Sequence, residues 1–199
     1  MSGFEFNINR NEILACAERI LEKSKKASLH SVKDVINGKF NTAEGVYLFV
    51  DVNEDEIKRI VRVGTHTQSD NIGSRLKAHY KGSDSNSVFR KMLRNVLEKK
   101  LNSKIKNKTV TEEIQKYKFV FIDTKGFSKD ERLKTESKII ATLSWAALLS
   151  SSFRDESKDS LFAYADNRTR LFGLWLKDGL LGEPYKNISD IEKLNFRTN

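Results

Sequence analysis

The rest of the chain is organised around residues 45–80, which read GVYLFVDVNEDEIKRIVRVGTHTQSDNIGSRLKAHY. Apolar side chains alternate in its two arms, at Val46, Leu48 and Val50 in the first and at Val61 and Val63 in the second. A period of two is typical of β-strands, because successive side chains of a strand point to opposite faces. The polar residues 51–56 between the arms favour a turn. The stretch therefore predicts two neighbouring antiparallel strands.

The other face of this hairpin combines glycine with aromatic and basic side chains. It carries Gly45, Tyr47 and Phe49 in the first arm and Ile60, Arg62 and Gly64 in the second. Glycine weakens a strand, and it often marks a bulge or a place where another group approaches the backbone closely. The two glycines are expected near the same end of the hairpin, where they would let a phosphate approach.

A polar loop follows the hairpin and leads into a short predicted helix. Ser69 and Asp70 are candidate caps of this helix. Arg75 and His79 are four positions apart and are therefore expected on one helical face. A guanidinium and an imidazole in this arrangement are suited to bind the same phosphate.

The next predicted helix is amphipathic and is capped by Ser87. Its inward face is assigned to the apolar residues Val88, Phe89, Met92, Leu93, Val96 and Leu97. Its outward face is assigned to the basic residues Arg90, Lys91, Arg94, Lys99 and Lys100. Such a face is either a solvated surface or a contact for a phosphate backbone, and the sequence leaves both interpretations open.

Secondary structure on either side of the hairpin completes the expected fold. Helices are predicted over residues 12–26 and over a short segment that Ser31 caps and Gly38 ends. Lys118–Asp123 is rich in β-branched and aromatic residues and predicts a third strand. The expected fold class is α+β, arranged as an α/β-type sandwich in which helices flank a small, three-stranded and mostly antiparallel sheet.

A long helix is predicted over residues 128–149, where Ser128 and Glu131 form a capping box. Its apolar stripe includes Leu133, Ile139, Ile140, Leu143 and Ala147, and Glu136 lies on that stripe. Burying an unpaired carboxylate costs several kcal/mol, so Glu136 requires a cation. The sequence leaves open whether that cation is a basic side chain or a metal ion.

The size of the chain favours a single domain over residues 1–199. A chain of 199 residues with 38% hydrophobic content can bury one sizeable core. We expect residues 1–43 to form a helical N-terminal extension, either structural or in contact with DNA. Residues 44–149 are expected to form the core, and residues 150–199 a C-terminal extension that packs on it.

Charge and cysteine content narrow the class of function. The formal net charge of +9 favours a polyanionic partner. The single cysteine, Cys16, excludes an internal disulfide framework and a thiolate zinc cluster. The longest apolar run is too short for a membrane span, and the first residues lack a signal-peptide pattern. We therefore expect a cytoplasmic protein without a membrane partner.

An ordered set of these residues resembles the GIY-YIG nuclease superfamily, which includes homing endonucleases, the excision-repair incision nuclease and some type II restriction enzymes. The set comprises the tripeptides at 45–47 (GVY) and 62–64 (RVG), then Asn71, Arg75, Leu76, His79 and Glu136. The resemblance covers roughly residues 44–149. It departs from the family pattern at Arg62, which replaces a tyrosine, and in a longer hairpin connection over 51–56. The family's downstream polar residue, often asparagine, has a loose counterpart in Asn167.

The resemblance implies hydrolysis of DNA with one divalent metal, Mg²⁺ or Mn²⁺, held by Glu136 and several waters. Such sparse protein ligation suits Mg²⁺, which keeps much of its hydration shell. Tyr47 would orient or deprotonate the attacking water, and Arg75 would stabilise charge on the phosphate. A phenol is a weak base at neutral pH, so Tyr47 needs neighbouring cations, and Arg62 is a candidate for one. His79 would bond either Tyr47 or a phosphate.

Further DNA contacts are expected at a second set of polar residues, His66, Tyr80, Arg90, Arg94 and Asn167. Each main site residue also has a plain structural interpretation. Tyr47 is then a half-buried strand aromatic, Arg62 an exposed strand cation and His79 a solvent-facing helix residue.

The expected function is a metal-dependent DNA endonuclease, of the restriction or genome-defence kind. A homodimer is the simplest arrangement for an enzyme that cuts both strands. Two alternatives stay open: a non-catalytic DNA-binding module that keeps the fold, and a structure-specific DNA-repair nuclease.

Overall fold

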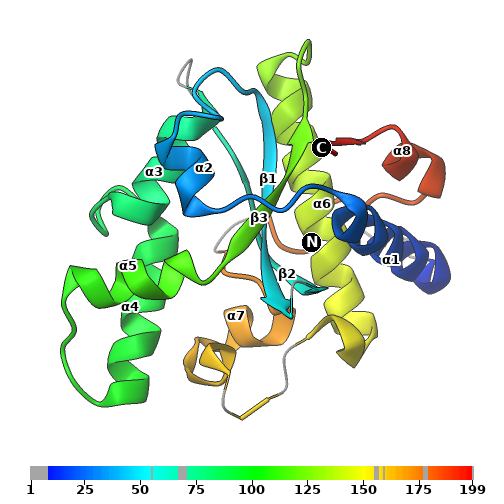
Figure 1. Cartoon of the computed structure of the whole chain (residues 1–199). Coiled ribbons are helices and arrows are strands. Elements are labelled where there is room, and N and C mark those ends of the chain that lie inside the picture. Colours follow the sequence, from blue (N-terminus) through cyan, green and yellow to red (C-terminus); the bar gives the residue numbers. More distant parts are fainter. Residues whose placement is uncertain are drawn as a thin grey trace, which may run out of the picture.

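The computed structural model describes residues 9–54, 56–66, 71–154, 157–158, 160–176 and 179–198. At its centre lies a sheet of four antiparallel strands in the order β2-β1-β3-β4 (Figure 1). They are β1 (Gly45–Asn53), β2 (Glu56–Thr65), β3 (Lys118–Asp123) and β4 (Asn195–Phe196). The expected sheet of three strands is therefore wrong by one strand. β4 spans only two residues, which is too short to produce an alternating pattern in the sequence.

The hairpin connection is shorter than the sequence suggested. β1 continues to Asn53 and β2 begins at Glu56, with Asn53 paired to Glu56. Glu54 turns the chain with a φ of 49°. The polar residues 51–56 therefore belong mostly to the two strands, because the tip of this hairpin extends away from the core and can be polar there.

An irregularity in β2 changes which side chains face the same way. Phe49 pairs with Arg62, but the next residue of β1, Val50, pairs with Ile60, so Val61 is an extra residue opposite them. Such a bulge disrupts the period of two. Ile60 therefore packs with Val63 on one side of the sheet, and Val61 packs on the other. The expected faces of the second arm were wrong at Ile60 and Val61 for this reason.

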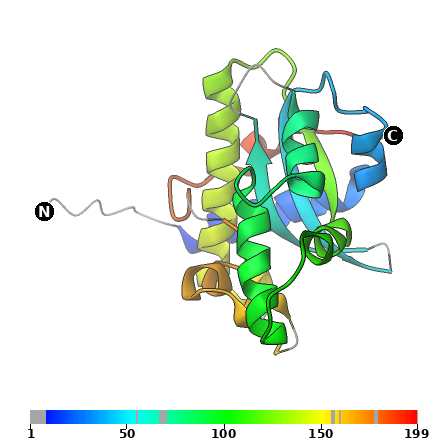
Figure 2. The same cartoon turned by 90° about the vertical axis from the view of Figure 1, so that its left-hand side faces the viewer.

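One layer of helices covers the first face of the sheet. It contains α1 (Arg10–Lys26), α6 (Lys129–Leu149) and α8 (Ile188–Glu192). The apolar residues of these helices form one core with the sheet side chains of Val46, Leu48 and Val63. Figure 2 shows α6 standing upright beside the sheet. This layer carries Glu136 toward the end of β2.

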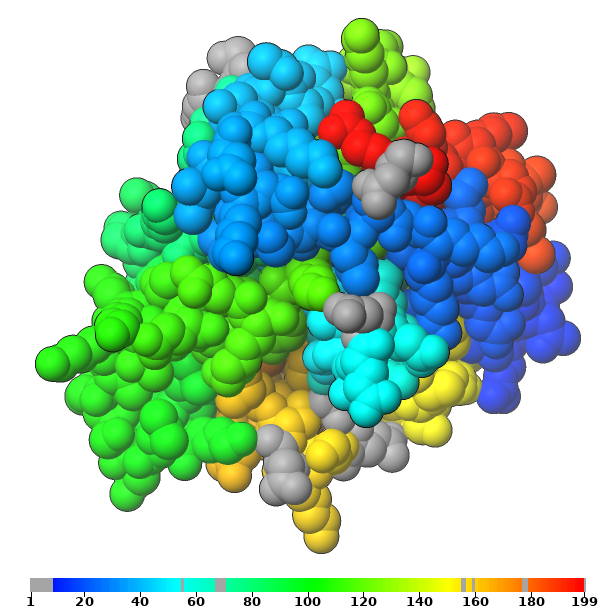
Figure 3. Space-filling view, viewed as in Figure 1, coloured from blue at the N-terminus to red at the C-terminus, as the bar shows by residue number. Residues whose placement is uncertain are grey.

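A second layer covers the opposite face. It contains α2 (Val32–Ile36), α3 (Ile72–Lys81), α4 (Val88–Leu101) and α5 (Asn107–Gln115). Their apolar residues form a second core with Tyr47, Phe49, Phe119 and Phe121 of the sheet. The segment that joins α1 to α2 crosses in front of β3, where His30 pairs with Phe119 (Figure 1). In the same view, this segment forms the molecular surface in front of the sheet (Figure 3). The resulting architecture is a sheet between two helical layers.

Side-chain caps explain where several of these helices begin. Ser31 and Ser128 each form a capping box, and Ser87 accepts the backbone N–H of Arg90 at 3.2 Å. Asn71 caps α3 by accepting the N–H of Ser74 at 3.0 Å. The caps proposed at Ser69 and Asp70 lie outside the described residues. Capping satisfies N–H groups that have no partner within the helix.

The C-terminal segment contributes to both cores. It contains the 3₁₀ turns η1 (Ser151–Phe153) and η2 (Leu161–Tyr164), the helix α7 (Asn167–Phe172), and then α8 and β4. Phe162 and Trp175 stack with ring centroids 4.3 Å apart in the core of the second layer. Leu174, Leu176 and Ile191 belong to the core of the first layer. Within the described part of the chain, no helix is both long and apolar enough to cross a membrane.

Candidate active site

A chain of three buried polar side chains lies between β1, α3 and the start of α4. The Tyr47 hydroxyl is 2.6 Å from Nε2 of His79, and Nδ1 of His79 is 2.7 Å from Oγ of Ser87. Tyr47 and His79 are fully buried, and Ser87 is 1% exposed. Both ring nitrogens of His79 are therefore occupied by partners in the chain. The expectation that His79 and Arg75 bind one phosphate together is wrong for His79.

Arg62 lies next to this chain, because it pairs with Phe49 on the face of the sheet that also carries Tyr47. Its guanidinium lies over the Phe89 ring, 5.1 Å from the centroid, and its Nη1 donates to the backbone carbonyl of Trp175. The backbone N–H of Trp175 donates in turn to the carbonyl of the bulged Val61 at 2.8 Å. Arg62 is only 5% exposed, so the interpretation as an exposed strand cation is wrong.

The charge of Arg62 is the central electrostatic feature of the site. Burial lowers the pKa of its guanidinium, and the neighbouring Tyr47 and Glu136 act against that shift, whereas Arg75 adds to it. Its Nε–H has no hydrogen-bond partner in the described part of the chain. A buried donor without a partner costs about 1–3 kcal/mol, and an anionic ligand would remove this cost.

The two hairpin glycines make room for parts of the protein itself. A Cβ at Gly64 would overlap the hydroxyl and ring of Tyr47. A Cβ at Gly45 would overlap the backbone carbonyl of Ile122 and the ring of Phe121. Both positions are filled from within, so the expectation that these glycines admit a phosphate is wrong. Gly64 instead allows the Tyr47 ring to lie over the neighbouring strand β2 and reach His79 on α3, since Tyr47 and Gly64 are paired in the register.

Glu136 reaches the same region from α6. Its Oε1 accepts the backbone N–H of Thr65 at 3.1 Å, and the hydroxyl of Thr65 donates to the carbonyl of Gly45 at 2.6 Å. Burial raises the pKa of the Glu136 carboxyl, while Arg62, the Thr65 N–H and Arg75 act in the opposite direction. Glu136 therefore lies at the end of the hairpin with two arginines near it, and neither forms a direct ion pair with it in the described structure.

The five main site residues predicted from the sequence therefore lie in one region. Tyr47, Arg75 and Glu136 act electrostatically on Arg62, and Arg62 and Arg75 act on His79. Burial lowers the pKa of His79 well below its usual range, and Arg62, Arg75 and Arg90 add to that effect. His79 is consequently neutral at physiological pH. The remaining charges are those of Arg62, Arg75 and Glu136, so the site has an excess of positive charge that suits a phosphate diester.

Glu136 also fits the requirements of a hard divalent cation. One carboxylate oxygen bonds Thr65, and burial disfavours the carboxylate charge, a cost that a bound cation would offset. Within the described residues, no group of three or more His, Cys, Asp and Glu side chains lies together. A site with so few protein ligands suits Mg²⁺, which retains several waters.

Two of the proposed DNA contacts are internal instead. Arg90 is 1% exposed, and its guanidinium donates to the carbonyls of His79 at 3.0 Å and Tyr80 at 3.4 Å, and to Thr111 at 3.1 Å. Tyr80 is fully buried and donates to the carbonyl of Tyr117 at 3.4 Å. Arg90 was misplaced because a side chain at the start of a helix can turn toward carbonyls at the end of a neighbouring helix.

The other three proposed contacts, Arg94, His66 and Asn167, lie in different settings. Arg94 is partly buried. Its guanidinium donates hydrogen bonds to Asp84, to Asn107 and to the carbonyl of Ile105, so it is already paired within the chain. His66 is 6% exposed. Asn167 is exposed on α7, where its side chain accepts from Arg170 at 3.0 Å, and it lines a surface depression with Arg154, Lys158 and Leu171. It is not part of the Tyr47 cluster.

Three further residues support the site, and few features of the sequence pointed to them. Ser87 was recognisable only as a helix cap. Thr65 directly follows the second tripeptide and was not singled out. Trp175 lies 113 residues after Arg62, and no local pattern connects the two.

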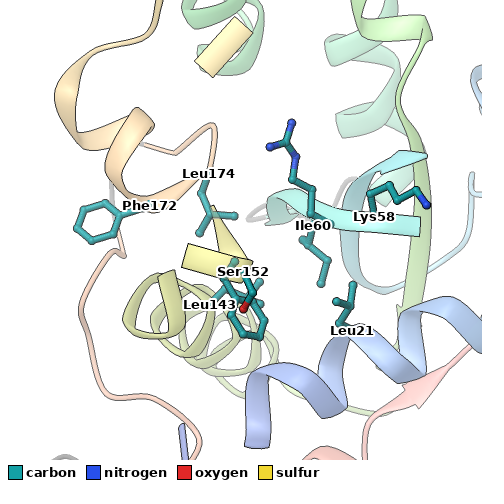
Figure 4. Close-up of a pocket in the computed structure, with 9 residues that line it drawn as sticks. Leu21, Lys58, Ile60, Leu143, Ser152, Phe172 and Leu174 are labelled. Atoms are coloured by element: carbon teal, nitrogen blue, oxygen red, sulfur yellow. The ribbon is translucent and has the colours of Figure 1, made fainter. Parts of the chain in front are cut away.

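An apolar cavity on the other face of the sheet is separate from this site (Figure 4). It is lined mainly by hydrophobic side chains of α1, β2, α6 and the C-terminal segment, including Leu21, Ile60, Leu143 and Leu174. None of the five main site residues lines it. The polar residues of its lining are Lys58, Arg59 and Ser152.

Comparisons with protein-family models, with curated proteins and with solved structures each found no match to this chain.

Proposed function

We propose that this chain is a metal-dependent DNA endonuclease that hydrolyses phosphodiester bonds. The observation that carries the proposal is the clustering of Tyr47, Arg62, Arg75, His79 and Glu136 from β1, β2, α3 and α6. The resemblance to the GIY-YIG superfamily named these five residues from their order in the sequence. A shared cluster is what such a site requires, whereas five unrelated structural residues have no reason to meet.

In the proposed reaction, the chain supplies a base and two cations. Once substrate binding has uncovered the phenolic oxygen, Tyr47 releases its proton to solvent and then accepts the proton of the attacking water. Its neighbour Arg62 places a buried positive charge close to Tyr47. Arg75, which is partly exposed, stabilises the negative charge that develops on the phosphate.

Glu136 would hold Mg²⁺ or Mn²⁺ through its carboxylate. When bound, the ion supplies Lewis-acid polarisation of the phosphate and neutralises part of its charge. The hydrogen bond from the Thr65 N–H fixes one oxygen of this carboxylate and leaves the other for a ligand.

A plasmid assay tests the proposal. We expect the wild-type protein to nick or cut DNA with Mg²⁺ and to lose the activity when the ion is chelated. Glu136→Ala and Arg75→Ala are expected to lower the rate by about 100-fold or more, as the loss of a charge-stabilising group does elsewhere. Lys25→Ala, which removes an exposed cation from α1, is the charge-matched control. Cleavage by Glu136→Ala at the wild-type rate would refute the metal assignment.

One observation favours a second candidate, a DNA-binding module without catalysis. Tyr47 and His79 are fully covered in the free chain, so catalysis requires that substrate binding expose the phenolic oxygen. A module that kept the fold for binding alone has no such requirement. Binding that weakens steeply with salt, without cleavage under Mg²⁺ or Mn²⁺, would identify this second function.

The biological setting of the proposal is DNA in the cytoplasm. A restriction or genome-defence enzyme would cut plain duplex, most simply as a homodimer that acts on both strands. A repair nuclease would prefer branched or damaged substrates. Comparing the cleavage rates of a linear duplex and a branched junction of the same sequence separates these two possibilities.

A further inference from the structure

We propose that Ser87 is a positioning residue that fixes the tautomer of His79 and thereby the hydrogen bonding of Tyr47. The Ser87 hydroxyl donates to Nδ1 of His79, and Nε2 of His79 then carries the ring hydrogen and donates it to the Tyr47 oxygen. The inference rests on the proposed function for its effect on catalysis, whereas the tautomer itself is measurable without any activity.

The hydrogen bonds of Ser87 determine its role as a donor. Its Oγ already accepts the backbone N–H of Arg90 at 3.2 Å and lies 2.7 Å from Nδ1 of His79. Among the described residues, Nδ1 is the acceptor found for the hydroxyl hydrogen. Ser87 is 1% exposed, so a hydroxyl hydrogen without an acceptor would cost about 1–3 kcal/mol. Donation to Nδ1 avoids this cost and leaves no hydrogen on Nδ1.

The surroundings of His79 hold the ring neutral and fixed. Three arginines, Arg62, Arg75 and Arg90, disfavour a positive charge on this buried imidazole. A neutral imidazole has one N–H, so a bare Nδ1 places the hydrogen on Nε2. The rings of Tyr47, Phe49 and Phe89 surround the imidazole at centroid distances of 5.7, 5.9 and 5.8 Å, which prevents it from turning over.

The consequence for Tyr47 is chemical. Its oxygen then accepts a hydrogen bond from Nε2 at 2.6 Å, beside the positive charge of the Arg62 guanidinium. The phenolic hydrogen is then not bonded to His79, and it can leave once substrate binding uncovers the buried phenol. In the opposite tautomer, Tyr47 would donate its proton to Nε2, and that bond would stabilise the phenol. Ser87 thus determines whether Tyr47 is poised to act as a base.

The competing explanation is that Ser87 only caps α4. Three substitutions distinguish the two roles. Ser87→Thr keeps both the cap and the hydroxyl donor, and Ser87→Ala removes both. Ser87→Asp keeps a good capping acceptor, but its carboxylate can only accept, so it would draw the ring hydrogen to Nδ1. Ser31→Ala, which removes the cap of α2 at a distance from the site, is the matched control.

The experiment records long-range ¹⁵N–¹H correlations of the histidine rings in the labelled full-length chain, together with cleavage kinetics. We expect the Nε2–H tautomer at His79 in the wild type, Ser87→Thr and Ser31→Ala, and the Nδ1–H tautomer in Ser87→Asp. The value of kcat is expected to fall by about 10- to 100-fold in Ser87→Ala and Ser87→Asp, as for other orienting partners of a functional histidine. KM is expected to stay within roughly twofold, because the effect is on the chemical step.

Two results would overturn the inference: an Nδ1–H tautomer in the wild type, or a Ser87→Asp variant with the wild-type tautomer and the wild-type kcat. The wild-type spectrum decides the assignment even if Ser87→Ala does not fold. If the wild-type protein cuts no DNA, the proposed function fails, while the tautomer measurement still confirms or refutes the role of Ser87.

Discussion

Gly64 is the residue on which the position of Tyr47 depends most directly. A Cβ at this position would overlap the Tyr47 hydroxyl, whereas a Cβ at Gly182 would meet nothing nearer than 3.7 Å. We expect Gly64→Ala to displace Tyr47 from His79, to destabilise the protein by about 1–3 kcal/mol and to abolish cleavage. Urea denaturation and the plasmid assay measure the two effects. Gly182→Ala is the control, and equal behaviour of the two variants would contradict the crowding argument.

The buried carboxylate of Glu136 is expected to lower the free energy of unfolding of the metal-free protein. Binding of a metal ion is expected to restore it. Burial raises the pKa of its carboxyl, so the folded state disfavours the ionised form. The resulting penalty is absent below the unfolded pKa of about 4.5 and develops as the pH rises through the folded pKa.

We therefore predict that Glu136→Gln raises the stability at neutral pH by on the order of 1 kcal/mol, or roughly 2–4 °C in Tm for a chain of this length. The gain should vanish in acid. Thermal unfolding with and without Mg²⁺ provides the test, with the ion stabilising the wild type and not the variant. A Tm that is lower than that of the wild type at neutral pH would show that the carboxylate stabilises the free fold instead.

At the scale of elements, Arg90 connects three helices through one guanidinium. It donates to the last carbonyls of α3, to the carbonyl of Asn107 and to Thr111 of α5, while its own backbone belongs to α4. A buried guanidinium cannot be removed without leaving these acceptors unsatisfied. The position that was expected to contact DNA is therefore structural.

We predict that Arg90→Met destabilises the protein by about 3 kcal/mol and that Arg90→Lys does not restore the loss, because an ammonium cannot reproduce the planar fork of donors. Urea denaturation measures the change. The neighbouring Lys91→Ala, on the exposed side of α4, is the control and should stay within about 0.5 kcal/mol of the wild type. A small effect at Arg90 would mean that water replaces the guanidinium.

The elements differ in how far the sequence could predict them. Caps and apolar stripes are local, so the starts of α2, α4 and α6 followed directly from Ser31, Ser87 and Ser128. The bulge at Val61 could not be predicted, because Val61 fits either face of a strand and its neighbours decide which. β4 is too short for any pattern and forms because β3 offers it a free edge.

The candidate site also combines features with a local signal and features that depend on distant residues. The order of the motifs predicted Tyr47, Arg75, His79 and Glu136 as site residues, and these four lie in one region of the structure. The burial of Arg62, and its bond to Trp175, depend on a segment far along the chain and have no local signature. Exposure was the quantity that the sequence predicted least well, as Arg90 and Tyr80 show.

At the scale of the whole molecule, two buried histidines link stability to pH. His30 packs edge-on against Phe40 with ring centroids 4.9 Å apart, and burial, with the charge of Lys39, lowers its pKa to about 4. Burial likewise lowers the pKa of His79. Because both folded-state values lie below the unfolded value of about 6.5, the unfolded chain binds more protons in acid.

We predict that the contribution of these histidines to stability is constant above pH ~6.5 and falls as the pH decreases toward ~4, by up to about 1.4 kcal/mol per pH unit for each histidine. His30→Phe, which suits the aromatic surroundings, should make this dependence shallower by about one proton. Urea denaturation across this pH range provides the slopes. An unchanged slope in His30→Phe would show that His30 is protonated in the folded state.

The bond between Arg62 and the Trp175 carbonyl also sets an order of events during synthesis. The arginine is made 113 residues before its partner, and the same later segment supplies the N–H that occupies the carbonyl of Val61. A nascent chain that ends before Trp175 must therefore keep Arg62 in water or bury its charge without this acceptor. The hairpin that carries the two tripeptides is translated early. Its Arg62 nevertheless acquires its carbonyl acceptor only after Trp175 has been made. Under the proposed function, a growing polypeptide would therefore not cleave DNA until Trp175 has emerged.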